Sequence, residues 1–161
     1  MREIKFRAKR TDNGAWVYGD LQHVQRINTK EQAEQSGRYS EPAVRIANYD
    51  VDEQTIGQYT GMKDNNGKEI YEGDIVDWTF FYKAYCNGGA VEQDTIITGI
   101  IEWYQGGFIL KVINNDIEYA GQYSISGLNT DTESDAEVKG NIHDNPELLT
   151  EYKTEKKHGN D

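Results

Sequence analysis

Cysteine is almost absent from this chain, which carries one, Cys86, among 161 residues. A single cysteine cannot form an internal disulfide, so the sequence excludes a disulfide-stapled secreted scaffold and fits a reducing compartment. Long apolar runs are missing as well, since none approaches the roughly 18–20 residues of a membrane-spanning helix. The first residues alternate in polarity and lack the apolar block of a signal peptide. We therefore expect a cytoplasmic protein that makes no membrane contact.

Basic residues are outnumbered, with 17 Lys and Arg against 28 Asp and Glu, and the net charge is −11. Non-specific binding to nucleic acid requires clustered Lys and Arg, so this balance argues against nucleic acid as a partner. It favours solubility and a basic partner. One local exception is the strip formed by Lys5, Arg7, Lys9 and Arg10, which suits a nucleic-acid-binding module and a solvated strand face equally well.

Hydrophobic residues make up only 36% of the chain, but aromatic residues reach 11%. Aromatic side chains bury large areas, so we expect them to supply much of the core. Six of them cluster on two expected strands: Trp78, Phe80, Phe81, Tyr82, Trp103 and Tyr104. Strand alternation places Phe81 and Tyr104 on the outer face. There they are candidate binding residues for a peptide, a base or a second subunit, unless they too belong to the core.

Short strands separated by turn residues dominate the pattern. Residues 2–10 alternate between apolar and basic side chains, and a turn at 11–14 leads into a returning strand at 15–18, which predicts a β-hairpin. Further strands are expected at 43–47, 55–60, 75–82, 96–104, 108–112 and 117–125, with a loop at 83–94 and turns at 105–107 and 114–116. This spacing, with little helix, indicates a mainly β (β-rich α+β) fold organised as a small barrel or sandwich.

The polar segment 24–42 carries one helix signal. Thr29 and Gln32 match a capping box, in which each side chain satisfies a backbone donor of the other residue. This predicts a short helix over 30–35 that ends near Gly37. A mobile surface insertion fits the polar composition equally well.

A second helix signal lies near the end of the sequence. Asn145-Pro146-Glu147 places a capping residue, a proline and an acid in the order that begins a helix. Leu148, Leu149 and Tyr152 would form its buried stripe. We expect residues 151–161 to be a flexible tail.

Residues 58–76, QYTGMKDNNGKEIYEGDIV, concentrate Asp, Asn and Gly between two apolar runs. Aligning Gly67 with the invariant glycine of an EF-hand calcium loop puts a methionine at position 1 and a glycine at position 12, and neither can serve there. As a turn the segment is coherent, because Asn66-Gly67 supplies positive φ angles and Asp64 bonds its own following backbone. We therefore expect a hairpin here, followed by a second bend at residues 72–74.

Patterns of catalytic or metal-binding residues are missing. Cys86 has no activating neighbour in the sequence, and His23, His143 and His158 are isolated. The neighbouring pair His143 and Asp144 more often caps a helix than performs acid–base chemistry. We expect no catalytic residue, no metal site and no cofactor, and therefore no enzyme.

Three segments together resemble the YopX-like family of phage and prophage proteins: MREIKFRAKR with the following YGDL, QYTGMKDNNGKEIYEGDIV, and VKGNIHDNPELL. The resemblance implies a β-rich N-terminal region over 1–67, which includes the polar insertion near 24–42. It implies a C-terminal SH3-like small β-barrel over 68–150. It also implies a phage or prophage product in a bacterial host that self-associates as a homo-oligomer, and it brings no established activity.

The expected function is that of a non-enzymatic phage accessory protein. It would act through contact with a host or phage protein, or through self-assembly. Two alternatives remain open. One is a nucleic-acid-associated module built on the basic strip, and the other is an acidic decoy of a nucleic-acid-binding host protein, which would need carboxylates arrayed on one face.

Overall fold

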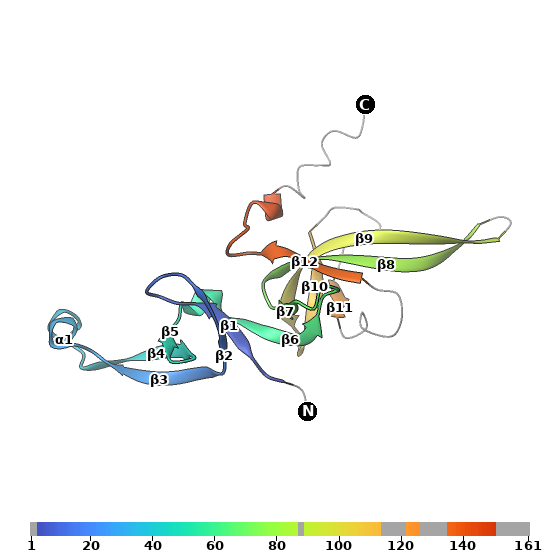
Figure 1. Ribbon diagram of the computed structural model, residues 1–161. Coiled ribbons are helices and arrows are strands. Elements are labelled where there is room, and N and C mark those ends of the chain that lie inside the picture. Colours follow the sequence, from blue (N-terminus) through green and yellow to red (C-terminus); the bar gives the residue numbers. More distant parts are fainter. Residues whose placement is uncertain (1–2, 87–88, 114–121, 126–134, 151–161) are drawn as a thin grey trace. The chain divides into compact units, whose positions relative to one another are not determined.

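The computed structural model describes residues 3–86, 89–113, 122–125 and 135–150, and of residues 80–95 and 135 it describes the backbone alone (Figure 1). Over this part of the chain the fold is mainly β, with antiparallel strands and little helix, which confirms the mainly β part of the expected fold. The chain divides into two compact units, residues 1–59 and 60–161. The expected boundary after residue 67 stays a prediction. None of the described helices is long and apolar enough to cross a membrane.

The predicted N-terminal hairpin forms from β1 (Phe6–Lys9) and β2 (Trp16–Gly19), which pair antiparallel. The Arg10 N–H donates to the Ala15 carbonyl at 2.9 Å and closes the turn. Gly14 lies in the turn with a φ of 71°, a left-handed conformation that glycine adopts without strain. The Asn-Gly signal therefore predicted both the turn and its position.

Two further strands extend this sheet in the order β2-β1-β6-β7. β6 (Gly57–Lys63) pairs with β1 through its first residues, and β7 (Glu69–Tyr71) is the next strand. A single 3₁₀ turn, η1 (Glu53–Thr55), precedes β6, and the Asp52 side chain caps it by accepting from the Gln54 N–H.

A second sheet of the first unit consists of β3 (Leu21–Ile27), β4 (Ser40–Ile46) and β5 (Tyr49–Asp50). The predicted helix, α1 (Lys30–Ser36), lies between β3 and β4. The expectation of a helix or a mobile insertion over 24–42 was wrong for residues 24–27 and 40–42, which belong to strands. Both faces of these strands are largely exposed, so their side chains lack the apolar–polar alternation that identifies a half-buried strand.

A small apolar cluster holds the first unit together. Its four buried residues come from β1, from β4 and from the position directly after β5: Ala8, Val44, Ile46 and Val51. Partly buried residues packed against them are Phe6, Val17, Leu21 and Ile56. The predicted alternation of β1 is present in this cluster, because Phe6 and Ala8 face it while Lys5, Arg7 and Lys9 belong to the opposite face.

The second unit contains one five-stranded antiparallel sheet in the order β11-β10-β9-β8-β12. Its strands are β8 (Asp74–Cys86), β9 (Gly89–Tyr104), β10 (Gly107–Val112), β11 (Gln122–Ser124) and β12 (Asp135–Asn141). Among the described residues β11 and β12 do not pair, so this sheet is not closed into a barrel. Its core contains Val76, Trp78, Ile101, Phe108 and Leu110, as the alternation of their strands predicts.

The prediction of a loop at 83–94 was wrong, because β8 and β9 continue through this segment as one long hairpin. Lys83 pairs with Glu92, and Cys86 pairs with Gly89. The polar composition of this segment concealed the strands. The two residues between Cys86 and Gly89 are Asn-Gly, a frequent two-residue hairpin sequence, and they lie outside the described residues together with the turn predicted at 114–116.

The turn predicted in 58–76 is confirmed. Asp64 Oδ1 accepts hydrogen bonds from the backbone N–H groups of Asn66 and Lys68, at 2.9 and 2.8 Å. Of the Asn66-Gly67 pair only Gly67 has a positive φ, 79°, so the prediction was wrong for Asn66. The second bend follows, where the buried Asp74 accepts from the Tyr71 N–H at 2.8 Å.

The C-terminal helix signal is confirmed at its start, since helical residues follow Asn145-Pro146-Glu147 at 148–150. The Asn145 side chain does not cap this helix. Its Oδ1 accepts from the Asn141 N–H at 3.3 Å, within the loop between β12 and the helix. Tyr152 and the predicted tail lie outside the described residues.

Candidate functional site

Residues 21–46, which comprise β3, α1 and β4, form an arm of the first unit (Figure 1). At the base of the arm Leu21, Val44 and Ile46 join the apolar cluster. None of the described residues 22–43 belongs to either apolar cluster of the chain. The arm beyond its base therefore contributes nothing to the described cores, although a two-stranded hairpin by itself is only marginally stable in water.

One face of the arm is stabilised by charge instead. Arg26 on β3 forms ion pairs with Glu41 on β4 and with Asp50 on β5, the latter at 3.3 Å between Nη1 and Oδ2. Arg45 Nε donates to Asp50 Oδ1 at 2.5 Å. The hydrogen bond from Arg45 and the nearby charges of both arginines hold the pKa of Asp50 below its ordinary value, against the opposing effect of burial. These pairs connect all three strands of the small sheet.

The tip of the arm combines a well-capped helix with exposed apolar side chains. Thr29 and Gln32 form the predicted capping box, and Gly37 ends α1 in the left-handed conformation. Next to the helix, Ile27 is 84% exposed and Tyr39 is 86% exposed. These are the most exposed of the large hydrophobic residues in the described part of the chain. Covering such side chains with a partner is favourable, because it removes apolar surface from water.

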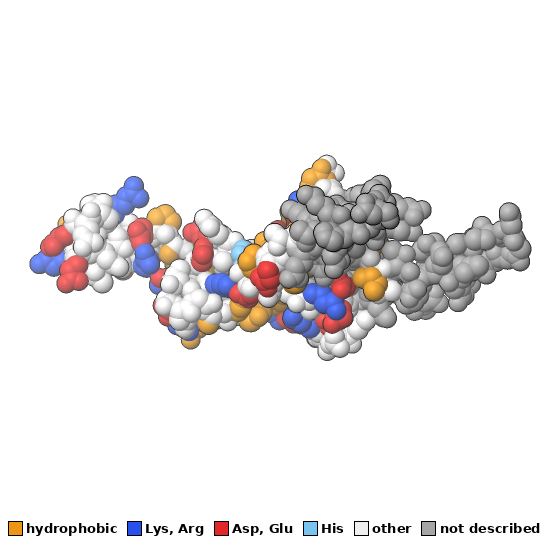
Figure 2. All heavy atoms as spheres, turned by 90° about the horizontal axis from the view of Figure 1, so that it is seen from above, with side chains coloured by type: hydrophobic (Ala, Val, Ile, Leu, Met, Phe, Trp, Pro, Cys, Tyr) orange, Lys and Arg blue, Asp and Glu red, His pale blue; other side chains and the backbone are white. Residues whose placement is uncertain are grey.

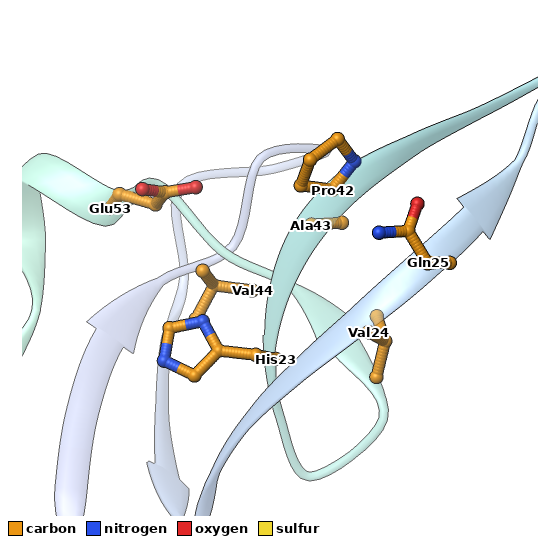
Figure 3. Close-up of a pocket in the computed structure, with 7 residues that line it drawn as sticks. All are labelled: His23, Val24, Gln25, Pro42, Ala43, Val44 and Glu53. Carbon is orange, nitrogen blue, oxygen red and sulfur yellow. The ribbon is translucent and has the colours of Figure 1, made fainter.

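The other face of the arm contains a pocket of about 290 Å³ near η1 (Figure 3). Its lining comes from β3, β4 and η1: His23, Val24, Gln25, Pro42, Ala43, Val44 and Glu53. In Figure 3 the imidazole of His23 lies beside Val44, and Glu53 lies across the pocket from Gln25. The pocket is thus lined by four apolar and three polar residues, a combination that suits a small side chain that carries a hydrogen-bond donor.

His23 is isolated in the sequence, and the pocket that it lines was not predicted. The register of β3 with β4 places His23 opposite Val44, and η1 supplies Glu53 from a segment 30 positions later. Local sequence patterns do not predict that these separate elements contribute to one pocket. A nucleophile is absent from the lining, and the described residues contain no group of three metal ligands. The arrangement can bind but has no constellation for acyl transfer or metal chemistry.

The basic strip of β1 lies against aromatic rings. Arg7 and Lys9 lie over the ring of Trp16, at 4.8 and 5.5 Å from its centroid. Lys5 lies 5.6 Å from the centroid of Tyr59, and Arg10 lies 3.8 Å from that of Tyr49. Arg7 is only 5% exposed. The solvated-face interpretation was therefore wrong for Arg7, because its cation is buried over a π-face.

Acidic and basic side chains are interspersed elsewhere on the surface. Figure 2 shows red and blue side chains beside one another over the described residues of the face it presents. That face shows no continuous basic patch, which binding to nucleic acid would need. It also shows no array of carboxylates, which an acidic decoy would need.

The two predicted binding residues lie on β8 and β9. Tyr104, at the end of β9, is 46% exposed, and its hydroxyl accepts from the Gln105 amide at 3.1 Å. The neighbouring Trp103 is 48% exposed and meets Phe108 edge-on, with 4.9 Å between ring centroids. The backbone of Phe81 pairs with Asp94, but its side chain is outside the description. Whether Phe81 and Tyr104 bind a partner stays a prediction.

Comparisons with known proteins identify a family but no activity. No curated protein matches the chain. A crystal structure of protein EF1440 from Enterococcus faecalis is similar at 26% identity, over 92% of this chain and 99% of that chain, with a TM-score of 0.45. The family model described as "YopX protein" matches residues 5–150. This chain therefore belongs to the YopX family.

Proposed function

We propose that the chain is a non-enzymatic protein–protein interaction module of a phage or prophage, which acts in the cytoplasm of a bacterial host. The observation that carries the proposal is the arm. It adds no described residue beyond its base to an apolar cluster, yet three ion pairs and a capped helix stabilise it. A segment that is stabilised without serving the core is suited to serve a partner.

The apolar residues at the tip give the proposal its contact chemistry. Ile27 and Tyr39 are almost fully exposed and lie next to a polar helix, an arrangement of apolar anchors within a polar rim. Tyrosine is enriched among residues that dominate binding energy, because its ring is large and loses little entropy when it is fixed. We propose the tip of the arm, rather than Phe81 and Tyr104 alone, as a principal contact surface.

The SH3-like barrel implied for the second unit fits the same proposal. β8, β9, β10 and β11 form a meander, and β12 returns to pair with the first of these strands. This connectivity supports a sheet that curls toward a small partly open barrel. Such barrels commonly present loops and exposed aromatics to partners, which remains an analogy at the level of the fold.

Binding to nucleic acid is the second candidate function. It rests on the basic strip beside Trp16, because stacked aromatics among cations are a feature of single-strand binding surfaces. We place it second because Arg7 is buried and the net charge is −11.

The test is a comparative pull-down of the tagged protein from nuclease-treated bacterial lysate, with an untagged copy of the chain co-expressed. The arm variant is the double substitution Ile27→Ser and Tyr39→Ser. The control is Ile96→Ser, which removes another exposed apolar side chain, 57% exposed, outside the arm.

We expect at least one protein, identified by mass spectrometry, that the wild type and the control retain and the arm variant loses. Circular dichroism checks that the arm variant keeps its strands. Equal capture by all three proteins, or capture that depends only on Ile96, would overturn the proposal for the arm. The wild type is also tested in lysate that has not been treated with nuclease, and capture that appears only there would favour the nucleic-acid alternative.

A further inference from the structure

The outer edge of β3 has no partner strand among the described residues. β3 lies at one end of the order β3-β4-β5 and pairs only with β4. Figure 1 shows it along the border of the arm. An open edge presents unpaired backbone N–H and C=O groups, which are a template for another strand.

The direction of these backbone groups follows from the ladder between β3 and β4. The Asn28 N–H donates to the Tyr39 carbonyl at 3.0 Å, so this pair is a hydrogen-bonded one. Hydrogen-bonded and non-hydrogen-bonded pairs alternate in an antiparallel ladder. Arg26, Val24 and Gln22 therefore bond to β4, while the N–H and C=O groups of four residues point to the open edge: Leu21, His23, Gln25 and Ile27.

Two observations on β4 support this assignment. The Val44 carbonyl, opposite His23, accepts from the Val51 N–H at 3.1 Å on the side away from β3. Pro42, opposite Gln25, has no N–H to donate to β3 in any case. Both residues occupy positions that the alternation makes non-hydrogen-bonded.

Among the described strands, β3 has fewer of the features that prevent edge pairing than the other free edges have. β12, of the same length, has an irregularity between Val138 and Gly140 and carries Glu137 and Lys139. The edge strands β2, β7 and β11 have four residues or fewer. β3 has seven residues, no proline, no bulge and one charged residue, Arg26. Bulges, charges and shortness are the usual protection of edges. β3 has no bulge and is not short, and its one charge, Arg26, is paired within the arm with Glu41 and Asp50.

The sequence of β3 is complementary to itself when it pairs antiparallel about Val24. In that register Ile27 lies opposite Leu21 of the second copy, and His23 lies opposite Gln25. Arg26 lies opposite the uncharged Gln22 rather than another cation. The exposed Ile27 thereby gains an apolar neighbour on the face of the sheet that carries the core, and about eight new backbone hydrogen bonds form.

Charge also favours a second copy at this edge. Two chains of net charge −11 repel each other, and β3 contains no acidic residue. The charge of Arg26 is already balanced within its own arm by Glu41 and Asp50. β3 is therefore a segment where two copies can approach with little electrostatic cost.

We infer that two copies of this chain pair antiparallel along β3, about a two-fold axis at Val24, to form a continuous six-stranded sheet from two copies of the β3-β4-β5 sheet. This inference rests on the proposed function, since it names the partner of the arm. Because the axis is perpendicular to the sheet, the pockets beside His23 lie on the same side of the joined sheet. Because the contact is the pairing of a single strand edge, we expect the dimer to be reversible and dependent on concentration.

The first test measures the mass of the full chain by sedimentation velocity across a concentration series. Gln25→Pro removes an N–H that points to the open edge and leaves the β3–β4 hydrogen bonds in place. Gln25→Thr is the matched control, because it keeps the N–H and changes the same side chain. We expect Gln25→Pro to weaken the dimer at least tenfold, and Gln25→Thr to leave it intact. A wild type that stays monomeric throughout, or a dimer that Gln25→Pro leaves unchanged, overturns the inference.

The second test locates the axis in a Cys86→Ser background. Val24→Cys places two sulfurs at a non-hydrogen-bonded pair, where Cα atoms lie about 4.5 Å apart, within the range that a disulfide spans. Gln22→Cys, on the same face, places its two Cα atoms about 14 Å apart, which no disulfide can bridge. Mild oxidation should link the first variant and leave the second monomeric. A linked Gln22→Cys variant, or an unlinked Val24→Cys variant, rejects this register.

These results are separable from the proposed function. If the chain is monomeric but the arm still captures another protein, the inference fails and the interaction function stands. If arm-dependent capture fails as well, both fail.

Discussion

Asp64 accepts a hydrogen bond from the backbone N–H of Val138 at 3.2 Å, although 74 positions separate the two residues. The same carboxylate accepts from Asn66 and Lys68 through its other oxygen. The Asn65 N–H donates to the Ala136 carbonyl at 3.0 Å beside it. One buried side chain therefore both closes the turn between β6 and β7 and attaches that turn to β12.

Replacing Asp64 by alanine should destabilise the second unit strongly. Three backbone N–H groups lose their acceptor, that of Val138 in a buried place and those of Asn66 and Lys68 in a partly buried one, which costs about 3 kcal/mol of unfolding free energy. Asn65→Ala is the matched control, because its side chain is exposed in the same turn, and it should change stability by less than about 0.5 kcal/mol. Urea unfolding followed by circular dichroism measures both values. Equal stability of the two variants would contradict this role of Asp64.

Gly99 on β9 has no room for a side chain. A Cβ placed there would lie 2.7 Å from both Leu110 Cγ and the Lys111 carbonyl oxygen on β10. We expect Gly99→Ala to lower the unfolding free energy by about 1–3 kcal/mol through overpacking. Gly107→Ala serves as the control, since a Cβ at Gly107 meets nothing within 4 Å. Its stability should stay near that of the wild type, and a comparable loss in both variants would argue against the steric explanation.

The turn between β9 and β10 contains a strained residue. Gln105 has a φ of 48° and Gly106 a φ of 89°, the two positive values of a tight hairpin turn for which Asn-Gly is the preferred sequence. Gln105→Asn should therefore raise the unfolding free energy by about 0.5–1 kcal/mol. Gln105→Val tests the opposite sign, because a β-branched residue tolerates this conformation poorly. Thermal unfolding of both variants and the wild type checks that stability increases from valine to glutamine to asparagine at position 105.

Short-range signals account for most of what could be predicted from the sequence. The capping box at Thr29, the turn glycine Gly67 and the Gln105-Gly106 turn each act within a few residues, and each is where it was expected. The family resemblance rested on the same kind of local segment. Strand register and burial of charge are decided by residues far apart along the chain.

Those long-range features are the ones that were missed. β3 could not be identified because neither face of most of its length is buried, so no period-2 pattern is selected. The burial of Arg7 depends on Trp16 across the hairpin, and the pocket at His23 depends on Glu53 from η1. The candidate site is built from these relationships. Outside it, alternation correctly placed Tyr104 at the surface.

Acid should weaken the arm through Asp50. The hydrogen bond from Arg45, with further contributions from Arg26, holds the pKa of Asp50 below its ordinary value. A carboxyl group whose pKa is lower in the folded state than in the unfolded state adds stability that is present above the unfolded pKa, about 3.9. That stability is lost as the pH falls through the lower folded pKa. Hydrogen-exchange protection of β3–β4 amides should decrease in this acidic window, and Asp50→Asn should remove its contribution to the decrease.

A carboxyl-detected NMR titration of Asp50 measures the cause directly. The pKa of Asp50 should lie below the ordinary value in the wild type and should rise in Arg45→Gln more than in Arg26→Gln, because the hydrogen bond from Arg45 is the larger cause. Arg45 Nε also lies closer to the carboxylate, at 2.5 Å against 3.3 Å for Arg26 Nη1. An Asp50 that titrates at its ordinary value would mean that the ion pairs do not stabilise the arm. A rise in Arg26→Gln alone would transfer that role from Arg45 to Arg26.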